Sequence, residues 1–267
     1  MIKDYLGSLI KVFFNIKNSY KKFYQNSNFY DKKISKSFNN NFEYKPSPYL
    51  LSSIIKYQKK KYKIDDFSLE SIWQKDINSK DFEKLNNFFW FFSLDLKSSK
   101  RITQSIIIKW INNNSRFNPK SWDFDLTSKR IISWLSNHRL TYENSSEEYK
   151  KSFNFIIQKQ TNHLINEIKN SDEVNNKIIG CAAIILIGLA YQNQKNYVTT
   201  GLNLLKKIIK TSIDNQGFPK SRCINQLSFY LKYFILIREW FKESQNNIPD
   251  YLDEIIYYLG SSYNFIW

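Results

Sequence analysis

Glycine and proline are scarce in this chain, with six and five residues among 267. Folds made of many short strands need frequent tight turns, which these two residue types supply, so an all-β sandwich is disfavoured. There are only two histidines and two cysteines, and Cys181 and Cys223 lack the spacing of a metal site. The sequence therefore predicts long helices with short connections, no metal site and no cofactor.

Acidic residues are also few, with 24 against 40 lysines and arginines, which gives a net charge of +16. This excess fits a polyanionic partner such as a polysaccharide, a nucleic acid or a membrane surface. It equally fits A/T-rich codon usage, because lysine, asparagine, isoleucine, tyrosine and phenylalanine are all abundant. The basic residues are scattered and no nucleic-acid-binding motif is found, so we predict no nucleic-acid partner.

Long apolar runs are missing too, and no transmembrane segment is predicted. Apolar residues in 1–23 follow helical spacing with a lysine-rich opposite face, which indicates an amphipathic helix. Asp4 and Lys11 interrupt the apolar run and no small-residue cleavage site follows, so there is no clear signal peptide. We expect this helix to pack against the body of the protein, with a membrane-surface location as the alternative.

Two regions are predicted. Residues 1–80 comprise the amphipathic helix and an irregular basic segment, whereas residues 81–267 show continuous helical periodicity. At least seven helices with short links imply antiparallel neighbours, as in a bundle, a helical repeat array or an α/α toroid. The segment AAIILIGLAY, residues 182–191, is apolar nearly all round and is predicted to be the buried centre, with Ile185 as a core residue.

Four stretches, in order, resemble segments of the heparinase II/III-like family. They are FNPKSWDFDLTSKRIISWLSN at 117–137, the long helix at 146–171, AAIILIGLAY at 182–191 and IDNQGFPKSR at 213–222. The resemblance covers roughly residues 80–265. It implies an all-α fold, an incomplete or complete α/α toroid of antiparallel helix pairs with no β-sandwich present. The sequence indicates a cytoplasmic location, whereas the family also permits a periplasmic one.

Lyases of this family cut uronic-acid polysaccharides by β-elimination, which needs carboxylate neutralisation, a base and an acid. The resemblance places the family's Asn-His pair at Asn175 and Asn176, so Asn175 is a candidate catalytic residue and the histidine is absent. An Asn-His dipeptide does occur at His163, on a different predicted helix. The family's tyrosine falls in CINQ at 223–226, and the nearest tyrosine is Tyr230, so the base is not evident.

Candidate substrate-binding residues come from the matched segments, where arginine can pair with a sugar carboxylate and tryptophan can support a pyranose ring. They are Trp122, Arg130, Trp134, His138 and Arg222. We expect them to converge on one concave face. The structural alternatives are that the tryptophans are core residues, that Arg130 is an internal ion-pair partner, and that Arg222 belongs to an ordinary helix–helix turn.

The resemblance thus implies the helical part of a polysaccharide lyase that is inactive alone, with acidic polysaccharide and a missing C-terminal β-sandwich domain as partners. The alternative is a non-catalytic scaffold that binds acidic polysaccharide.

Overall fold

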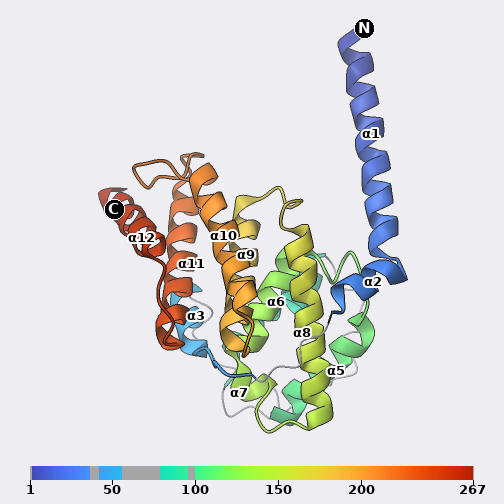
Figure 1. Cartoon of the computed structure of the whole chain (residues 1–267), viewed down its shortest axis with the longest axis vertical. Coiled ribbons are helices and arrows are strands. Elements are labelled where there is room, and N and C mark those ends of the chain that lie inside the picture. The colour runs from blue at the N-terminus through green and yellow to red at the C-terminus, as the bar shows by residue number, and fades with distance from the viewer. Residues whose placement is uncertain (1, 37–41, 56–78, 96–99, 267) are drawn as a thin grey trace.

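The structure, a computed structural model of the whole chain, describes residues 2–36, 42–55, 79–95 and 100–266 (Figure 1). Its helices in the N-terminal region are α1 (Ile2–Gln25), α2 (Asn28–Ile34) and α3 (Pro48–Ile55). The body contains α4 (Ser79–Asn87), the 3-10 helix η1 (Phe89–Ser93), α5 (Lys100–Asn114), α6 (Phe124–Ser136), α7 (His138–Thr141), α8 (Glu147–Glu167), α9 (Val174–Ala190), α10 (Lys195–Ser212), α11 (Ile224–Glu243) and α12 (Asp250–Ile266).

Helix starts are set by local capping. The Asp123 carboxylate accepts hydrogen bonds from the backbone N–H groups of Asp125 and Leu126, which have no partner within the first turn of α6. Ser146 caps α8 in the same way through the N–H of Tyr149. Pro249 directly precedes α12, where its fixed φ suits a helix start. These local signals set the starts of α6, α8 and α12.

The aromatic run after residue 81 differs from the single helix that its periodicity suggests. Helix α4 ends at Asn87, and Phe88 takes the left-handed conformation with φ of 59° before the short helix η1. The Asn87 side chain accepts a hydrogen bond from the N–H of Phe89 and so stabilises the turn. Phe88 is buried edge-on against Trp110 and Trp134. Aromatic packing thus outweighs the cost of a positive φ, which is about 1–3 kcal/mol.

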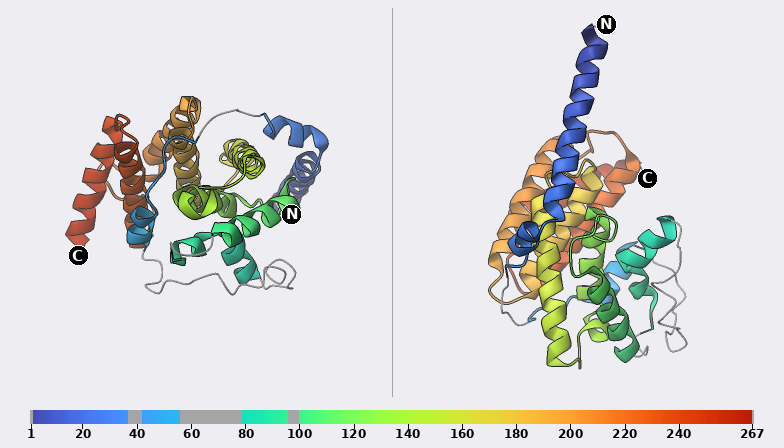
Figure 2. Two further views of the ribbon diagram at one scale, coloured as in Figure 1. Left: turned by 90° about the horizontal axis from the view of Figure 1, so that it is seen from below. Right: turned by 90° about the vertical axis from the view of Figure 1, so that its right-hand side faces the viewer.

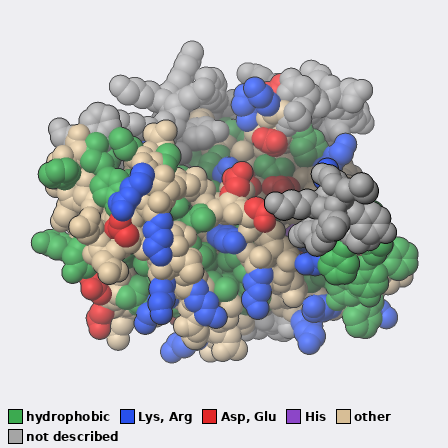
Figure 3. Space-filling model, turned by 90° about the horizontal axis from the view of Figure 1, so that it is seen from above, with side chains coloured by type: hydrophobic (Ala, Val, Ile, Leu, Met, Phe, Trp, Pro, Cys, Tyr) green, Lys and Arg blue, Asp and Glu red, His purple; other side chains and the backbone are tan. Residues whose placement is uncertain are grey.

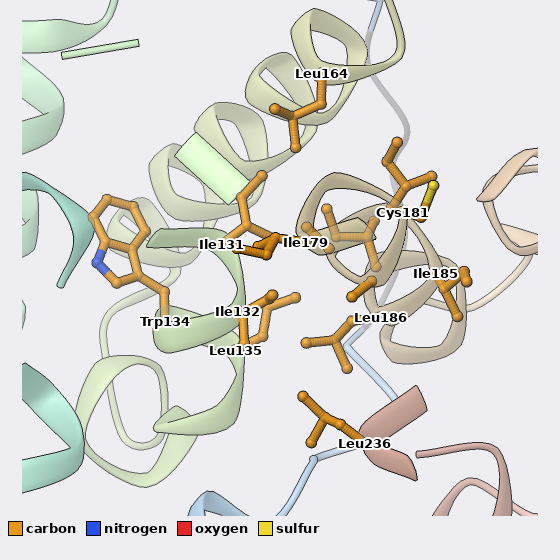
Figure 4. Close-up of a cluster of buried hydrophobic side chains, with 14 of the residues drawn as sticks. Ile131, Ile132, Trp134, Leu135, Leu164, Ile179, Cys181, Ile185, Leu186 and Leu236 are labelled. Carbon is orange, nitrogen blue, oxygen red and sulfur yellow. The ribbon is translucent and has the colours of Figure 1, made fainter. Parts of the chain in front are cut away.

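Helix α9 is the centre of the core, as predicted. Every residue of α9 from Ile178 to Ala190 is buried, and the helix packs against α10, α6, α11 and α8. Figure 4 shows Ile179 and Leu186 pointing from α9 toward Ile131 and Ile132 of α6. Because neighbouring helices cover all of its faces, α9 needs an apolar side chain at nearly every position.

Neighbouring helices such as α9 and α10, and α11 and α12, pack as antiparallel pairs, and the helices of the body together form a curved array (Figures 1 and 2). The predicted all-α fold of antiparallel helix pairs is confirmed. Among the described residues there is no strand, and isolated β-bridges join Phe42 to Tyr191 and Ile213 to Pro219.

Two glycines let α9 and α10 approach closely. A Cβ atom at Gly188 on α9 would lie 2.5 Å from the backbone nitrogen of Val198 on α10. In the reverse direction, a Cβ atom at Gly201 on α10 would lie 2.5 Å from Cγ1 of Ile185 on α9. A Cβ atom at Gly260 on α12, by contrast, would have no atom within 4 Å.

Alanine substitution at these glycines is therefore expected to have opposite effects. Gly188→Ala should destabilise the protein by about 1–3 kcal/mol, because the added methyl group meets backbone atoms that must shift. The matched control Gly260→Ala should stabilise it by about 0.5–1 kcal/mol, because alanine favours a helix and finds open space. Urea unfolding measures both values, and equal effects of the two substitutions would contradict this account of the α9–α10 contact.

The N-terminal region meets the body at α2, which packs on α8, and at α3, which packs on α11 and η1. The expectation that the first helix packs along the body needs correction. Helix α1 projects away from the other helices, and only its C-terminal end lies against them (Figure 1). The structure describes only part of the predicted irregular segment, because residues 56–78 lie outside the described residues. The proposed boundary at residue 80 stays a prediction.

Candidate functional site

A hollow of about 390 Å³ lies at the end of the array where α6 and α9 begin and α5 and α8 end. The C-terminal end of α1 forms one side of it. The residues that line it come from α1, the α5–α6 loop, the start of α6, α8, the α8–α9 loop and the first turn of α9. They are Lys21, Lys22, Gln25, Phe117, Pro119, Trp122, Asp123, Phe124, His163, Glu167, Asn170, Ser171 and Asn176.

Glu167 fixes the end of α1 to this hollow. One carboxylate oxygen lies 2.5 Å from the Lys21 ammonium group, and the other accepts a hydrogen bond of 2.8 Å from the buried Gln25 amide. The next residue, Lys22, is exposed and also lines the hollow. The α1 end thus places two ammonium groups at the rim, one of them neutralised by Glu167.

His163 forms the floor of the hollow and is held as a neutral ring. Its Nε2 atom lies 3.1 Å from the Trp122 carbonyl oxygen, which can only accept, so Nε2 carries the proton. The Nδ1 atom therefore accepts the 2.7 Å hydrogen bond from the Tyr30 hydroxyl. Burial lowers the pKa of His163 to about 4. Burial, together with the charge of Glu167, raises the pKa of Tyr30 above its ordinary range.

Aromatic and amide side chains complete the walls. Phe117 and Phe124 are half-buried, so part of each ring remains accessible. The Phe117 ring lies 5.1 Å from the His163 ring, and the Phe124 ring rests on Gly180, where a Cβ atom would lie only 2.4 Å away. Half-buried Asn176 adds an amide that can donate and accept hydrogen bonds. The hollow can therefore bind a polar ligand that also has flat apolar faces.

Asn175, the candidate catalytic residue, adjoins the hollow in sequence but is not among the residues that line it. Its Oδ1 atom is buried and has no hydrogen-bond partner among the described residues. Asn176, at the family's histidine position, is the member of the pair that lines the hollow.

The structure places Trp122, Arg130 and Trp134 in the interior rather than on an open sugar-binding face. Trp122 is 1% exposed, and its ring nitrogen donates to the Asn114 carbonyl group. Trp134 is fully buried and stacks edge-on with Phe88. Packed helices enclose both rings, and Trp134 is a core residue. Trp122 also lines the hollow, so its role in binding a sugar stays a prediction.

Arg130 is buried without a carboxylate in contact. Its guanidinium group donates to the Gln160 side chain, the Asn86 carbonyl group and the Thr127 hydroxyl, and lies 4.0 Å from the centre of the Trp110 ring. Burial lowers the pKa of this guanidinium group. Arg130 thus joins α4, α6 and α8 and is not available to an external carboxylate.

His138 and Arg222 lie apart from the hollow. His138 follows α6, at the opposite end of that helix from the hollow, with Nε2 3.3 Å from Glu143. Arg222 belongs to the turn between α10 and α11, where it pairs with Asp214 at 2.7 Å. The expected convergence of these two residues with Arg130 on one concave face is therefore corrected.

The α10–α11 turn is held by the Asp214 carboxylate and contains Gly217 in the left-handed conformation. Asp214 accepts hydrogen bonds from the N–H groups of Gln216 and Phe218, and Gly217 takes a φ of 78° against the backbone of Tyr258.

A second hollow, of about 430 Å³, lies beside this turn. It is lined by Lys206, Ile209, Lys210, Asp214, Asn215, Tyr251, Glu254, Ile255 and Tyr258. The turn therefore connects α10 to α11 and closes one side of this hollow.

Sequence reasoning missed Lys21, Lys22, Phe117 and Asn170, since they come from three separate segments.

The described part of the chain contains no group of three potential metal-ligating side chains. None of its described helices is both long and apolar enough to cross a bilayer.

The sequence matches no protein-family model, and no curated protein is significantly similar to it. Among solved structures, the chain is similar to a crystal structure of heparinase III, with a TM-score of 0.56 and 18% identity. The similarity covers 70% of this chain and 31% of that protein, so this chain spans less than a third of its length. At this identity the likeness concerns the fold, and the chain therefore has a heparinase-like helical fold.

Proposed function

We propose that this chain is a polysaccharide-lyase-like helical scaffold that binds acidic polysaccharide in the 390 Å³ hollow without cleaving it. The observation that carries the proposal is the composition of that hollow, which combines exposed Lys22, accessible aromatic rings and the Asn176 amide. An ammonium group attracts sulfate or carboxylate groups, aromatic rings cover pyranose faces, and amides bind hydroxyl groups. The heparinase-like fold supports a sugar polymer as the class of ligand.

The proton-transfer groups argue for binding without turnover. β-Elimination needs a base and an acid that exchange protons near the working pH. The buried pair of His163 and Tyr30 is held in its neutral form, since burial lowers the pKa of the histidine and raises that of the tyrosine. Cleavage would then require groups from another domain, which in the heparinase II/III-like family is a β-sandwich.

A binding assay with heparan sulfate and polyuronate oligosaccharides tests this proposal. We expect salt-sensitive binding that the double variant Lys22→Gln/Asn176→Ala weakens by about tenfold or more, because it loses a charge-assisted hydrogen bond and an amide contact. The matched control is Lys207→Gln/Asn203→Ala on α10, which removes the same groups outside the hollow. An ultraviolet assay for unsaturated sugar should detect no product.

Because the whole chain is basic, the control decides between a site and general attraction. An equal loss of affinity in both double variants would contradict a site at the hollow. Equal affinity for a DNA duplex of similar charge, with the same dependence on Lys22, would contradict a preference for sugars. Robust product formation would show that the chain is a lyase by itself.

A further inference from the structure

Helix α1 carries an apolar stripe that faces away from the body. Its members are Val12, Phe13, Ile16, Tyr20 and Phe23, with exposed fractions between 53% and 76%. At 3.6 residues per turn these side chains fall within an arc of about 100°. Among the described residues nothing covers this stripe, and Figure 1 shows the helix projecting from the other elements.

The polar contacts that hold α1 to the body lie on a different side of the helix, whereas Tyr24 borders the stripe. Lys21 and the buried Gln25 both bind Glu167, and the Tyr24 ring packs edge-on against the buried Tyr30 ring at 5.3 Å. The apolar stripe is therefore not the face that fixes the helix to the body. Exposed Phe29 on α2 lies beside Tyr24, with ring centroids 6.2 Å apart.

The charge of α1 indicates which kind of partner can bind the stripe. Residues 11–25 contain four lysines and no acidic residue. The lysines, at positions 11, 17, 21 and 22, fall outside the apolar arc. Figure 3 shows one group of apolar side chains at the right-hand edge of the molecule, with lysines and arginines spread over the same face.

We propose that α1 docks the protein on an anionic lipid surface, with the aromatic stripe inserted at the level of the headgroups. A lysine-rich helix with an aromatic and aliphatic opposite face suits that interface. Tyrosine and phenylalanine contribute large apolar areas, and each lysine near an anionic surface adds about 1 kcal/mol of attraction. The chain's net charge of +16 acts in the same direction.

The charge of α1 disfavours a second copy of this chain as the partner of the stripe. Paired amphipathic helices use opposite charges beside the seam to offset repulsion, and residues 11–25 offer lysine alone. Two α1 helices would bring eight like charges together, whereas an anionic bilayer neutralises them.

Vesicle flotation with the full chain tests the proposal. The protein should float with vesicles of equal parts phosphatidylcholine and phosphatidylglycerol and remain mostly unbound with phosphatidylcholine alone. The variant Ile16→Gln/Tyr20→Gln/Phe23→Gln should lower the partition coefficient by about 100-fold or more. The matched control Phe155→Gln/Tyr257→Gln/Phe265→Gln replaces exposed apolar residues of α8 and α12 and should leave partition unchanged.

A second pair of variants tests the role of charge. Lys11→Gln/Lys17→Gln should reduce binding by about fivefold for each lysine, whereas Lys151→Gln/Lys207→Gln on the body should have little effect. Neither pair touches the residues of the polysaccharide hollow, so this result is independent of the proposed function. Equal binding to both vesicle types would overturn the proposal. So would a concentration-dependent dimer, seen by sedimentation without lipid and abolished by the triple variant of α1.

Discussion

Ile185→Asp is expected to abolish the folded state. Ile185 is fully buried near the middle of α9 and contacts α10 at Gly201. The substitution removes apolar contacts, which costs about 2–5 kcal/mol, and places a carboxylate among apolar side chains, which costs several kcal/mol more. Domains of this kind have a total stability of about 5–15 kcal/mol, so the loss is comparable to all of it. Soluble yield and the thermal unfolding transition measured by circular dichroism report the outcome.

The matched control is Ile224→Asp. Ile224 is 45% exposed and begins α11, where a carboxylate interacts favourably with the free N–H groups of the first turn. We expect this variant to remain soluble and to unfold near the wild-type temperature. A soluble Ile185→Asp protein with a cooperative transition would show that α9 is not the centre of the core.

Acidification from about pH 7 to about pH 5 is expected to destabilise the protein through its two histidines. Burial lowers the pKa of both His163 and His138 to about 4, below the ordinary value of 6.5. Between these two pH values the unfolded chain binds protons that the folded chain does not. The contribution of the neutral histidines to the free energy of unfolding is therefore present above about pH 6.5 and is lost as the pH falls toward about 4. For His163 the loss at pH 5 is about 2 kcal/mol, and His138 acts in the same direction.

Urea unfolding at the two pH values measures this effect. The free energy of unfolding should differ less between pH 7 and pH 5 in His163→Gln and in His138→Gln than in the wild type. The reduction in each variant equals the part of the pH-dependent loss that the replaced histidine causes. The comparison is independent of how much each substitution destabilises the protein at pH 7. Stability that stays constant or increases from pH 7 to pH 5 would contradict the buried neutral state of both rings, and titration of the ring protons by NMR would show the cause directly.

The candidate site could be predicted only in part. The segment that contains Trp122 does reach the hollow, and so does Asn176, since the loop before α6 and the first turn of α9 lie at the same end of two adjacent helices. The role of Arg130 could not be predicted from the sequence. An arginine in a lysine-rich chain can bind the carboxylate of a ligand, or it can form hydrogen bonds inside the protein. Its partners Asn86 and Gln160 lie 44 and 30 residues away, so only packing shows that the network is internal.

The fold followed from the sequence where the signals are local. Apolar residues at helical spacing, Asp123 and Ser146 as caps, and the apolar segment 182–191 determined the helices and identified the buried one. Each signal acts within a few residues, so periodicity and capping chemistry suffice to read it. The break at Phe88 could not be read in this way, because the aromatic partners that stabilise it come from α5 and α6.

The sequence by itself determined that this chain is helical, that α9 is buried and that α1 is amphipathic. Only the tertiary structure decided that the stripe of α1 faces solvent and that His163 is neutral beneath the hollow. It also decided that Trp134 and Arg130 are interior residues. The physical reason is that burial and hydrogen-bond partnership depend on residues far apart in the chain, and these two quantities decide whether a charged or aromatic side chain binds a ligand or stabilises the core.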